Sequence, residues 1–314
     1  MTTLHRLASD DATIRRMALI ELADEEDQAH LPLLVHSLQG DTDEAVRAEA
    51  ARLLASWETP EAVDALAQAL VDDAEAVRQA AGQSLTELKD ARLGERLLPW
   101  VRHAEPSVRC AALRALRELR VPAAASDALN ALASSDASVR REAVGVLGWL
   151  KQSDALPALA SLAVDDADAE VRRAATGALG MAEGRLDPVL PSLLEALRDP
   201  AWPVREEAAT TLAKLRPAAA QPALRAAMAD DSWQVRLRAA RALGRLKNPE
   251  ALPVLETALR HPIANLRKEA AIALGEIADP AAGTALHGAA GDPDPEVRKA
   301  ARLSLKALGW EVTP

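Results

Sequence analysis

The stretch SWQVRLRAARALGRL, residues 232–246, contains the pattern that decides the fold of this chain. Its apolar residues recur at the three- and four-residue spacing of an amphipathic helix. The dipeptide Val235-Arg236 begins that pattern, and an aliphatic-Arg dipeptide of this kind occurs ten times. Its arginines stand at positions 15, 47, 78, 109, 140, 172, 205, 236, 267 and 298. Spacings of 31 to 33 residues along the whole chain predict tandem repeats of one structural unit.

Each repeat contains two helical patterns. The second begins at the dipeptide, as in VRQAAGQSLTEL at 77–88, and the first is shorter, as in EAVDALAQAL at 61–70. Short polar side chains suited to cap a helix start lie four residues before six of the arginines: Asp11, Asp43, Asp136, Asp168, Ser232 and Asp294. Ala74, Ala201 and Ile263 break this pattern, so three second helices must begin differently. Five prolines fall in the first turn of first helices, at 32, 157, 191, 222 and 253, where the ring disrupts few hydrogen bonds.

A two-helix hairpin of this length cannot bury its apolar face alone, so neighbouring hairpins must stack on it. We therefore expect an all-α fold, a right-handed α-solenoid of about ten stacked two-helix repeats in a single domain that spans 1–314. We place the repeats at approximately 1–24, 25–58, 59–89, 90–120, 121–152, 153–184, 185–216, 217–247, 248–278 and 279–314.

Composition and charge limit the classes of function. The chain is 49% hydrophobic but only 2% aromatic, as expected for closely packed helices rich in alanine and leucine. Its net charge of -10 disfavours binding to nucleic acid or an anionic membrane. Cys110 is the only cysteine, which excludes an intrachain disulfide and favours the cytoplasm. No segment resembles a signal peptide or a membrane helix.

The pattern D-x-x-V-R-x-x-A-A-x-A-L-G resembles the short HEAT-like repeat named after the phycobilisome lyases, and the match covers essentially the whole chain. The resemblance implies an Asp-Arg ladder that links stacked loops. Loop aspartates near the arginines are Asp43, Asp73, Asp136, Asp168, Asp231 and Asp294. Because this repeat serves lyases, scaffolds, adaptors and artificial binders, it implies a fold more than a function.

Catalytic motifs are absent from the sequence. The six histidines lack ligand spacing, and no His-Glu dipeptide exists, which removes the metal motif of the HEAT-repeat deoxyhypusine hydroxylases. No Walker A, G-x-S-x-G or G-x-G-x-x-G segment occurs. Cys110 has no identifiable base partner, and we interpret it as a small residue on a helix surface. We therefore favour a non-catalytic protein with no cofactor and no metal.

Departures from the repeat indicate where a partner binds. In the resembled family the second helices line the concave wall, and the variable positions lie three and two residues before the arginine and one, two, five and nine after it. From repeat five onward these positions change from small, polar and acidic residues to tryptophan, methionine, glycine and arginine. We expect a partner-binding site on the concave face of repeats 5–8, formed by Trp149, Met181, Trp202, Lys214, Trp233, Arg238, Arg241 and Arg245.

Glycines contribute to this prediction in two ways. Gly145 and Gly177 leave space between the large side chains of the site, and glycines 148, 180, 244 and 275 indicate close helix-helix approach. The alternative for Trp202 and Trp233 is that each folds over its own loop. Trp57, Trp100 and Trp310 are interpreted as structural, with Trp310 covering an open end of the stack.

The resulting hypothesis is a scaffold or adaptor that binds another protein or peptide, for which an acidic and apolar segment is suited. The main alternative is a factor similar to the bilin lyases that attaches or inserts a chromophore or other cofactor. A HEAT-like DNA glycosylase is a third class, and the net charge weighs against it. The oligomeric state stays open.

Overall fold

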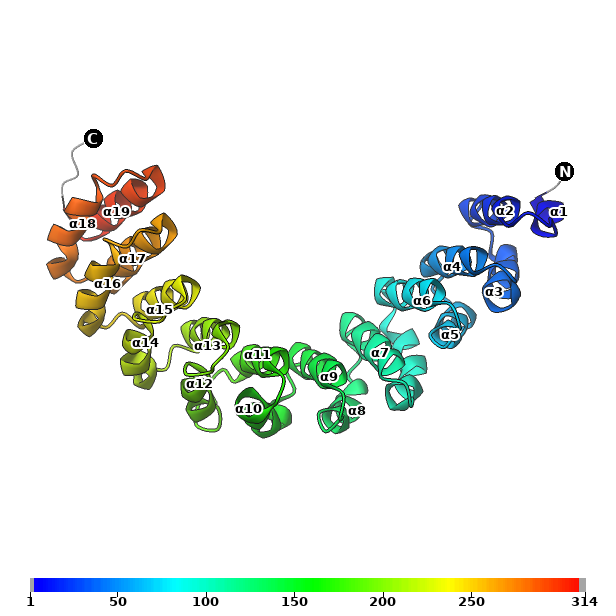
Figure 1. The fold of residues 1–314 in the computed structure, drawn as a ribbon, viewed down its shortest axis with the longest axis horizontal. Helices are drawn as coiled ribbons and strands as arrows, with labels where there is room; N and C mark the ends of the chain where they lie inside the picture. Colours follow the sequence, from blue (N-terminus) through cyan, green and yellow to red (C-terminus); the bar gives the residue numbers. More distant parts are fainter. Residues whose placement is uncertain (1–2, 311–314) are drawn as a thin grey trace. The chain divides into compact units, whose positions relative to one another are not determined.

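The computed structural model describes residues 3–310, and the regular structure within them is entirely helical (Figure 1). The second helices of the repeats are α2 (Ala12–Asp24), α4 (Glu44–Leu53), α6 (Glu75–Glu87), α7 (Pro106–Glu118), α9 (Ala137–Trp149), α11 (Ala169–Ala178), α13 (Trp202–Leu215), α15 (Trp233–Leu246), α17 (Ala264–Ile277) and α19 (Pro295–Ala307). The first helices are α3 (Leu31–Gly40), α5 (Pro60–Ala69), α8 (Ala124–Ala131), α10 (Leu156–Asp165), α12 (Leu190–Ala196), α14 (Gln221–Ala227), α16 (Leu252–Ala258) and α18 (Gly283–Ala289), with α1 (Thr3–Leu7) before α2. No helix within residues 3–310 is long and apolar enough to cross a membrane.

The first helices are less regular than the second. Several of them begin with a short 3-10 turn, and in the fourth repeat a 3-10 segment, Ala91–Arg102, replaces the first α-helix altogether. Pro99 lies inside that segment and removes a backbone donor that an α-helix would need. The five prolines predicted in first turns do occupy the first or second position of α3, α10, α12, α14 and α16.

Contacts divide the chain into two units, residues 1–152 and 153–314. This boundary falls where the sequence places the junction between repeats five and six. In the second unit, α11, α13, α15, α17 and α19 pack in order as one layer, and each also contacts the first helix of its own repeat. We call the outer surface of this layer the second-helix face. Figure 1 shows it on the inner side of the curve that the second unit makes.

Small and branched aliphatic side chains fill the core. The aliphatic residue of the repeated dipeptide is buried in nine of the ten repeats, from Val46 to Val297. Ile14, in the first repeat, is exposed. Alanines beside these positions let neighbouring helices pack closely.

Helix capping agrees with the prediction at five of six positions. Asp11, Asp43, Asp136, Asp168 and Asp294 each accept a hydrogen bond from a backbone N–H of the first turn. The prediction is wrong for Ser232, whose hydroxyl pairs with the Gln234 side chain instead.

A second recurring loop position fixes the start of every second helix, including those that lack a polar cap residue. Six residues before every repeated arginine, a side chain accepts the N–H of the residue that precedes the helix. These side chains are Ser9, Asp41, Asp72, His103, Ser134, Asp166, Asp199, Asp230, His261 and Asp292. The loops that contain Ala74, Ala201 and Ile263 are fixed in this way.

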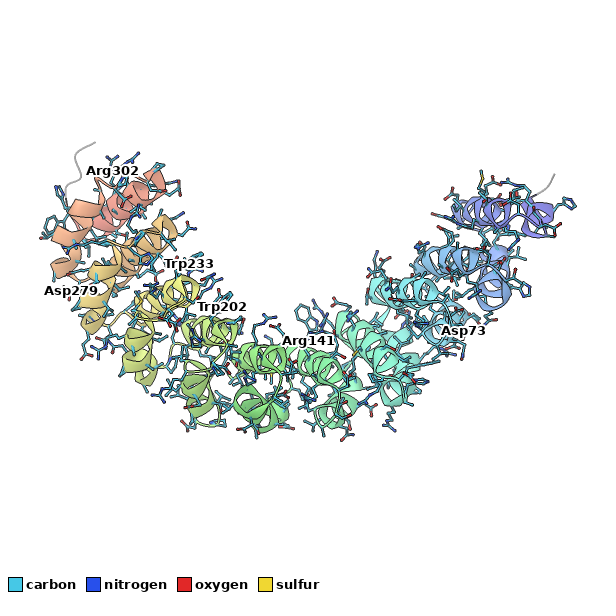
Figure 2. All side chains as sticks on the ribbon, viewed as in Figure 1. Asp73, Arg141, Trp202, Trp233, Asp279 and Arg302 are labelled. Carbon is cyan, nitrogen blue, oxygen red and sulfur yellow. The ribbon has the colours of Figure 1, made fainter. Side chains whose placement is uncertain are left out.

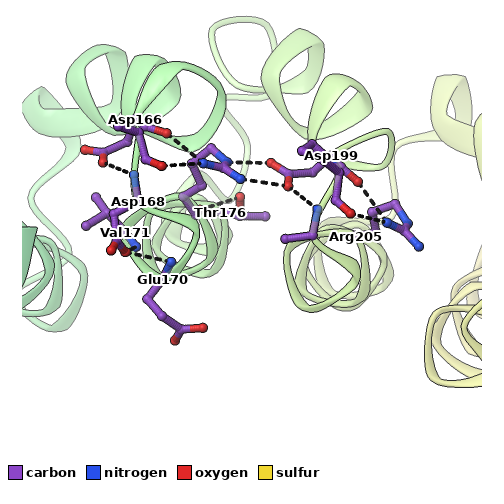
Figure 3. Close-up of polar contacts among 11 residues, drawn as sticks. Asp166, Asp168, Glu170, Val171, Thr176, Asp199 and Arg205 are labelled. Atoms are coloured by element: carbon purple, nitrogen blue, oxygen red, sulfur yellow. Dashed lines mark hydrogen bonds and ion pairs between the residues drawn. The ribbon is translucent and has the colours of Figure 1, made fainter.

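The same position supplies the acceptors of an Asp-Arg ladder. Arg15, Arg47, Arg172, Arg205 and Arg267 each donate two hydrogen bonds of 2.6–3.0 Å to the aspartate at this position in the next repeat. Their acceptors are Asp41, Asp72, Asp199, Asp230 and Asp292, and each arginine also binds a carbonyl of its own loop. Figure 3 shows this arrangement around Asp199 and Arg205.

The aspartates named from the sequence therefore have other roles. Asp43, Asp136, Asp168 and Asp294 cap helices, and Asp73 and Asp231 offer backbone carbonyls to the arginine of their own repeat. The ladder uses the position two residues before the cap because a carboxylate there accepts both the loop N–H and the guanidinium of the preceding repeat.

Candidate functional site

Trp202 and Trp233 begin α13 and α15, in equivalent positions of adjacent repeats (Figure 2). The Trp202 side chain is exposed at 42%, whereas Trp233 is half-buried. We call the edge formed by these two helix starts the tryptophan edge, and the Trp202 indole on it is accessible to solvent. Trp233 contributes one partly covered indole beside it.

The opposite end of the same helices carries a basic groove. A depression of about 370 Å³ is lined by Lys214, Arg216, Arg245 and Lys247, together with Ala213 and Glu276. Arg216 and Lys247 are the C-cap residues that follow α13 and α15, and both adopt the left-handed conformation, with φ of 53° and 54°. Four cations and a single carboxylate make this basic groove locally positive, in a chain whose net charge is -10.

Lys214 and Arg245 have only weak partners in this groove. The Lys214 ammonium lies 3.6 Å from Glu183, and both of these side chains are largely exposed. The Arg245 guanidinium lies 3.5 Å from the carbonyl oxygen of Ala213. An exposed ion pair such as that of Lys214 contributes little to stability, and the Arg245 hydrogen bond is at the long limit of such bonds, so both cations can exchange their partners for an anionic ligand.

Arg238 and Arg241 are bound within the protein. Arg241 donates two hydrogen bonds of 2.7 Å to Glu269, a buried carboxylate of α17. Arg238 donates to Glu206 of α13 at 2.9 Å. These pairs join adjacent second helices, which gives both arginines a structural role. Arg241, with two hydrogen bonds to a buried carboxylate, is much less available to a partner than the sequence implies.

Met181 and Trp149 lie apart from the tryptophan edge. Met181 ends the 3-10 turn that follows α11 and is half-buried. Its neighbour Gly180 packs near Lys214, so Met181 belongs to the basic end of the second-helix face. Trp149 lies in the first unit, where its ring is exposed at 53% and Arg120 stacks over it at 5.1 Å.

Gly145 and Gly177 do not leave an open groove. A Cβ added to Gly145 would lie 3.0 Å from the Arg117 guanidinium, and one added to Gly177 would lie 2.9 Å from the Glu207 carboxylate. Long side chains from adjacent repeats therefore occupy the space that the sequence assigns to a ligand. Burial raises the pKa of Glu207 there.

An apolar groove lies on the same face, and comparing the repeats of this sequence did not predict it. Between α17 and α19, a depression of about 380 Å³ is lined by Ile272, Gly275, Ala300, Leu303 and Ala307, with charged residues at its rim. We call it the Leu303 groove. Ile272 and Leu303 both stand five residues after the repeated arginine, a position that the sequence identifies as variable. Aliphatic residues in a helix-forming pattern do not stand out in sequence as tryptophans do.

The remaining candidates for chemistry have structural explanations. Cys110 is buried, not on the surface as we predicted, and its sulfur lies 3.2 Å from the Ser138 hydroxyl. Burial raises the pKa of the Cys110 thiol, which keeps it protonated and poorly nucleophilic. Trp57 is buried, and Trp100 stacks on His103. Among residues 3–310, no three His, Cys, Asp or Glu side chains are grouped to hold a metal ion.

Comparison with known proteins identifies the repeat. The family model for HEAT repeats matches residues 2–91, 94–180, 190–272 and 257–313. No curated protein matches the sequence. Among solved structures, an engineered protein from a structural genomics consortium is 22% identical, with a TM-score of 0.57 and 98% of each chain covered.

Nuclear transport receptors are similar in fold. Yeast importin-beta, Kap95p, is 15% identical with a TM-score of 0.68, and the alignment covers 98% of this chain and 50% of that one. Kap121p bound to Nup53p is 15% identical with a TM-score of 0.67, and the alignment covers 98% of this chain and 41% of that one. The chain spans half or less of these karyopherins, and at such identities the likeness concerns the fold alone. The repeats matched along nearly its whole length show that this chain belongs to the HEAT-repeat family.

Proposed function

We propose that this protein is a non-catalytic, cytoplasmic scaffold or adaptor that binds a partner protein on the second-helix face of the second unit. The observation that carries the proposal is the basic groove of Lys214, Arg216, Arg245 and Lys247, whose lining contains a single carboxylate, that of Glu276, and whose Lys214 has only a weak, exposed partner in Glu183. Protein partners also occur among HEAT structures of similar fold, as in the complex of Kap121p with Nup53p.

The chemistry of the face indicates the kind of partner. Carboxylates would pair with the four cations of the basic groove, and an apolar side chain would pack against Trp202. Trp202 and Lys214 are twelve residues apart on one helix, which corresponds to about 18 Å along its axis. An extended segment of about five or six residues spans that length, so a short acidic and apolar segment is sufficient.

The test compares charge reversals at two places. We expect Lys214→Glu with Arg245→Glu to abolish retention of the partner when the tagged protein is isolated from cells and bound proteins are identified by mass spectrometry. The control, Arg198→Glu with Arg260→Glu, changes the net charge equally at exposed cations outside the groove. Equal loss in both variants, or none in either, would contradict the proposal.

The tryptophans provide an independent test. Trp202→Ala with Trp233→Ala should remove binding while helicity and the thermal midpoint change little, because Trp202 is exposed and Trp233 is only half-buried. A large loss of stability would show instead that both residues are needed for the packing of the repeats.

The phycobilisome-lyase-type alternative predicts an absorbing ligand that purifies with the protein, and the glycosylase alternative predicts salt-dependent retention on DNA.

A further inference from the structure

We infer that the Leu303 groove is a second docking site, which takes an aliphatic side chain of the same acidic segment. This inference rests on the proposed function and extends it. The partner would carry carboxylates for the basic groove and, a few residues away, a leucine or isoleucine for the Leu303 groove.

The shape of the groove suits a single aliphatic anchor. Leu303 is exposed at 61%, more than any other large aliphatic side chain among residues 3–310, and Ile272 stands opposite it on α17. At the floor, Ser304 packs directly against Gly275, which brings α17 and α19 close together. A groove of about 380 Å³ lies within the range of small-ligand and peptide sites.

The two grooves adjoin. Glu276 of α17 lines both, so a segment that leaves the basic groove passes directly into the Leu303 groove. Neighbouring helices of a layer lie about 8–10 Å apart, so the centres of the two grooves are separated by about 16–20 Å. At about 3.3 Å per extended residue, the aliphatic anchor should follow the acidic residues by about five or six positions.

The rim of the Leu303 groove fits such a segment. Two lysines and two glutamates line the rim: Lys268 pairs with Glu296 at 2.9 Å, while Lys299 feels the charge of Glu296 without an ion pair among the described residues, so it can add a carboxylate of the partner. An apolar floor with a charged rim is the usual arrangement of a protein interface. Trp310 packs against Gly283 of α18, in the other layer, so the described end of the chain does not occupy the groove.

The experiment uses the full chain and random twelve-residue peptides displayed on phage. Enriched peptides are resynthesised with a fluorophore, and their affinities are measured by fluorescence polarisation. We expect enriched sequences to combine Asp or Glu with Leu or Ile at the spacing above. Leu303→Glu should weaken them at least tenfold, and Lys214→Glu with Arg245→Glu should do the same.

The control is Leu129→Glu, which alters an equally apolar, exposed residue of α8 in the first unit and should leave affinity unchanged. Thermal melts of all variants verify folding, and Leu303→Ala, expected to bind less tightly than wild type, replaces Leu303→Glu if the latter unfolds.

The outcomes separate this inference from the proposed function. Peptides that depend on Lys214 and Arg245 but not on Leu303 would overturn the second site and leave the proposed function standing. Peptide binding that depends on Leu303 but not on Lys214 and Arg245 would overturn the proposal that the partner segment is acidic. No enrichment, or no effect of either variant, would overturn both. A dimer in sedimentation that Leu303→Glu dissociates would instead assign the groove to a second copy of the chain.

Discussion

At the scale of the residue, one loop position determines how neighbouring repeats are joined. Its aspartate accepts the loop N–H and the arginine of the preceding repeat, as Asp230 does for Arg205. The ladder is interrupted where this residue is not an aspartate. His261 stands at that position after Arg236, and the Arg236 Nε is buried with no acceptor among the described residues. The His261 Nδ1 accepts the N–H of Ile263, so that nitrogen carries no proton.

We expect His261→Asp to complete the ladder and raise the free energy of unfolding by about 1.5–3 kcal/mol, the usual contribution of hydrogen bonds to a charged group. Burial, and then the charges of Arg236 and Arg267, lower the pKa of His261. The unfolded chain therefore binds its proton more readily, and the wild-type protein loses stability as the pH falls below about 6.5.

Urea unfolding at pH 7.5 and pH 5.5 measures both effects, and the His261→Asp variant should lose this part of the pH dependence. Ser134→Asp is the matched control, because Arg109 also has a buried Nε without an acceptor and Ser134 stands at the same ladder position. That variant should gain stability without altering the difference between the two pH values. A midpoint that does not rise in either variant would show that the interruptions carry no cost.

At the scale of the element, close contact between second helices depends on particular glycines. A Cβ on Gly244 of α15 would lie 2.7 Å from the Ala273 Cα of α17, and one on Gly275 would lie 2.6 Å from the Ser304 Cβ. The prediction of close approach is confirmed for these two. At Gly180 the nearest atom is the Lys214 Cδ, 3.4 Å away, so this glycine accommodates a flexible side chain instead.

We expect Gly244→Ala to destabilise the protein, because overpacking costs about 1–3 kcal/mol and the gain in helix propensity is at most about 1 kcal/mol. Gly82→Ala is the matched control in the interior of α6, where the new Cβ would meet its nearest neighbour at 3.6 Å. It should stabilise by up to about 1 kcal/mol. Thermal melts by circular dichroism should move the two midpoints in opposite directions; a shift in the same direction would contradict the close-packing argument.

At the scale of the whole molecule, the ladder makes both units sensitive to acid. The hydrogen bond from Arg47 lowers the pKa of Asp72 in the first unit, and the hydrogen bond from Arg267 lowers that of Asp292 in the second. A carboxylate with a lowered folded-state pKa contributes its full stability above the unfolded value of about 3.9 and loses it as the pH falls through the folded value.

We therefore expect the thermal midpoint to fall steadily between pH 5 and pH 2, with each ladder aspartate contributing about 1.5–3 kcal/mol. Asp72→Asn and Asp292→Asn should each lower stability at pH 7 and reduce the acid-induced loss. The measurement is a series of melts across this pH range at constant ionic strength. An unchanged midpoint, or variants with the same pH dependence as wild type, would show that the ladder does not govern acid unfolding.

Periodicity in the sequence alone predicted most of the fold. The second helices all contain the repeated dipeptide, and the proline and aspartate signals mark most helix starts correctly. Such features are local, since a cap or a first-turn proline acts on its own helix. The predictions failed where a side chain reaches another repeat. The ladder acceptors, the filled space over Gly177 and the pairing of Arg241 with Glu269 all depend on neighbours about thirty residues away.

The sequence by itself determined that this protein is a helical repeat and that its second-helix face changes character toward the C-terminal half. Only the tertiary structure decided which cations stay available, because stacking brings Glu269 to Arg241 while Lys214 and Arg245 find no strong acceptor. It also revealed the Leu303 groove, which requires the side chains of two helices at once. The physical reason is that helix formation depends on local sequence, whereas a binding surface depends on which long-range pairs are satisfied.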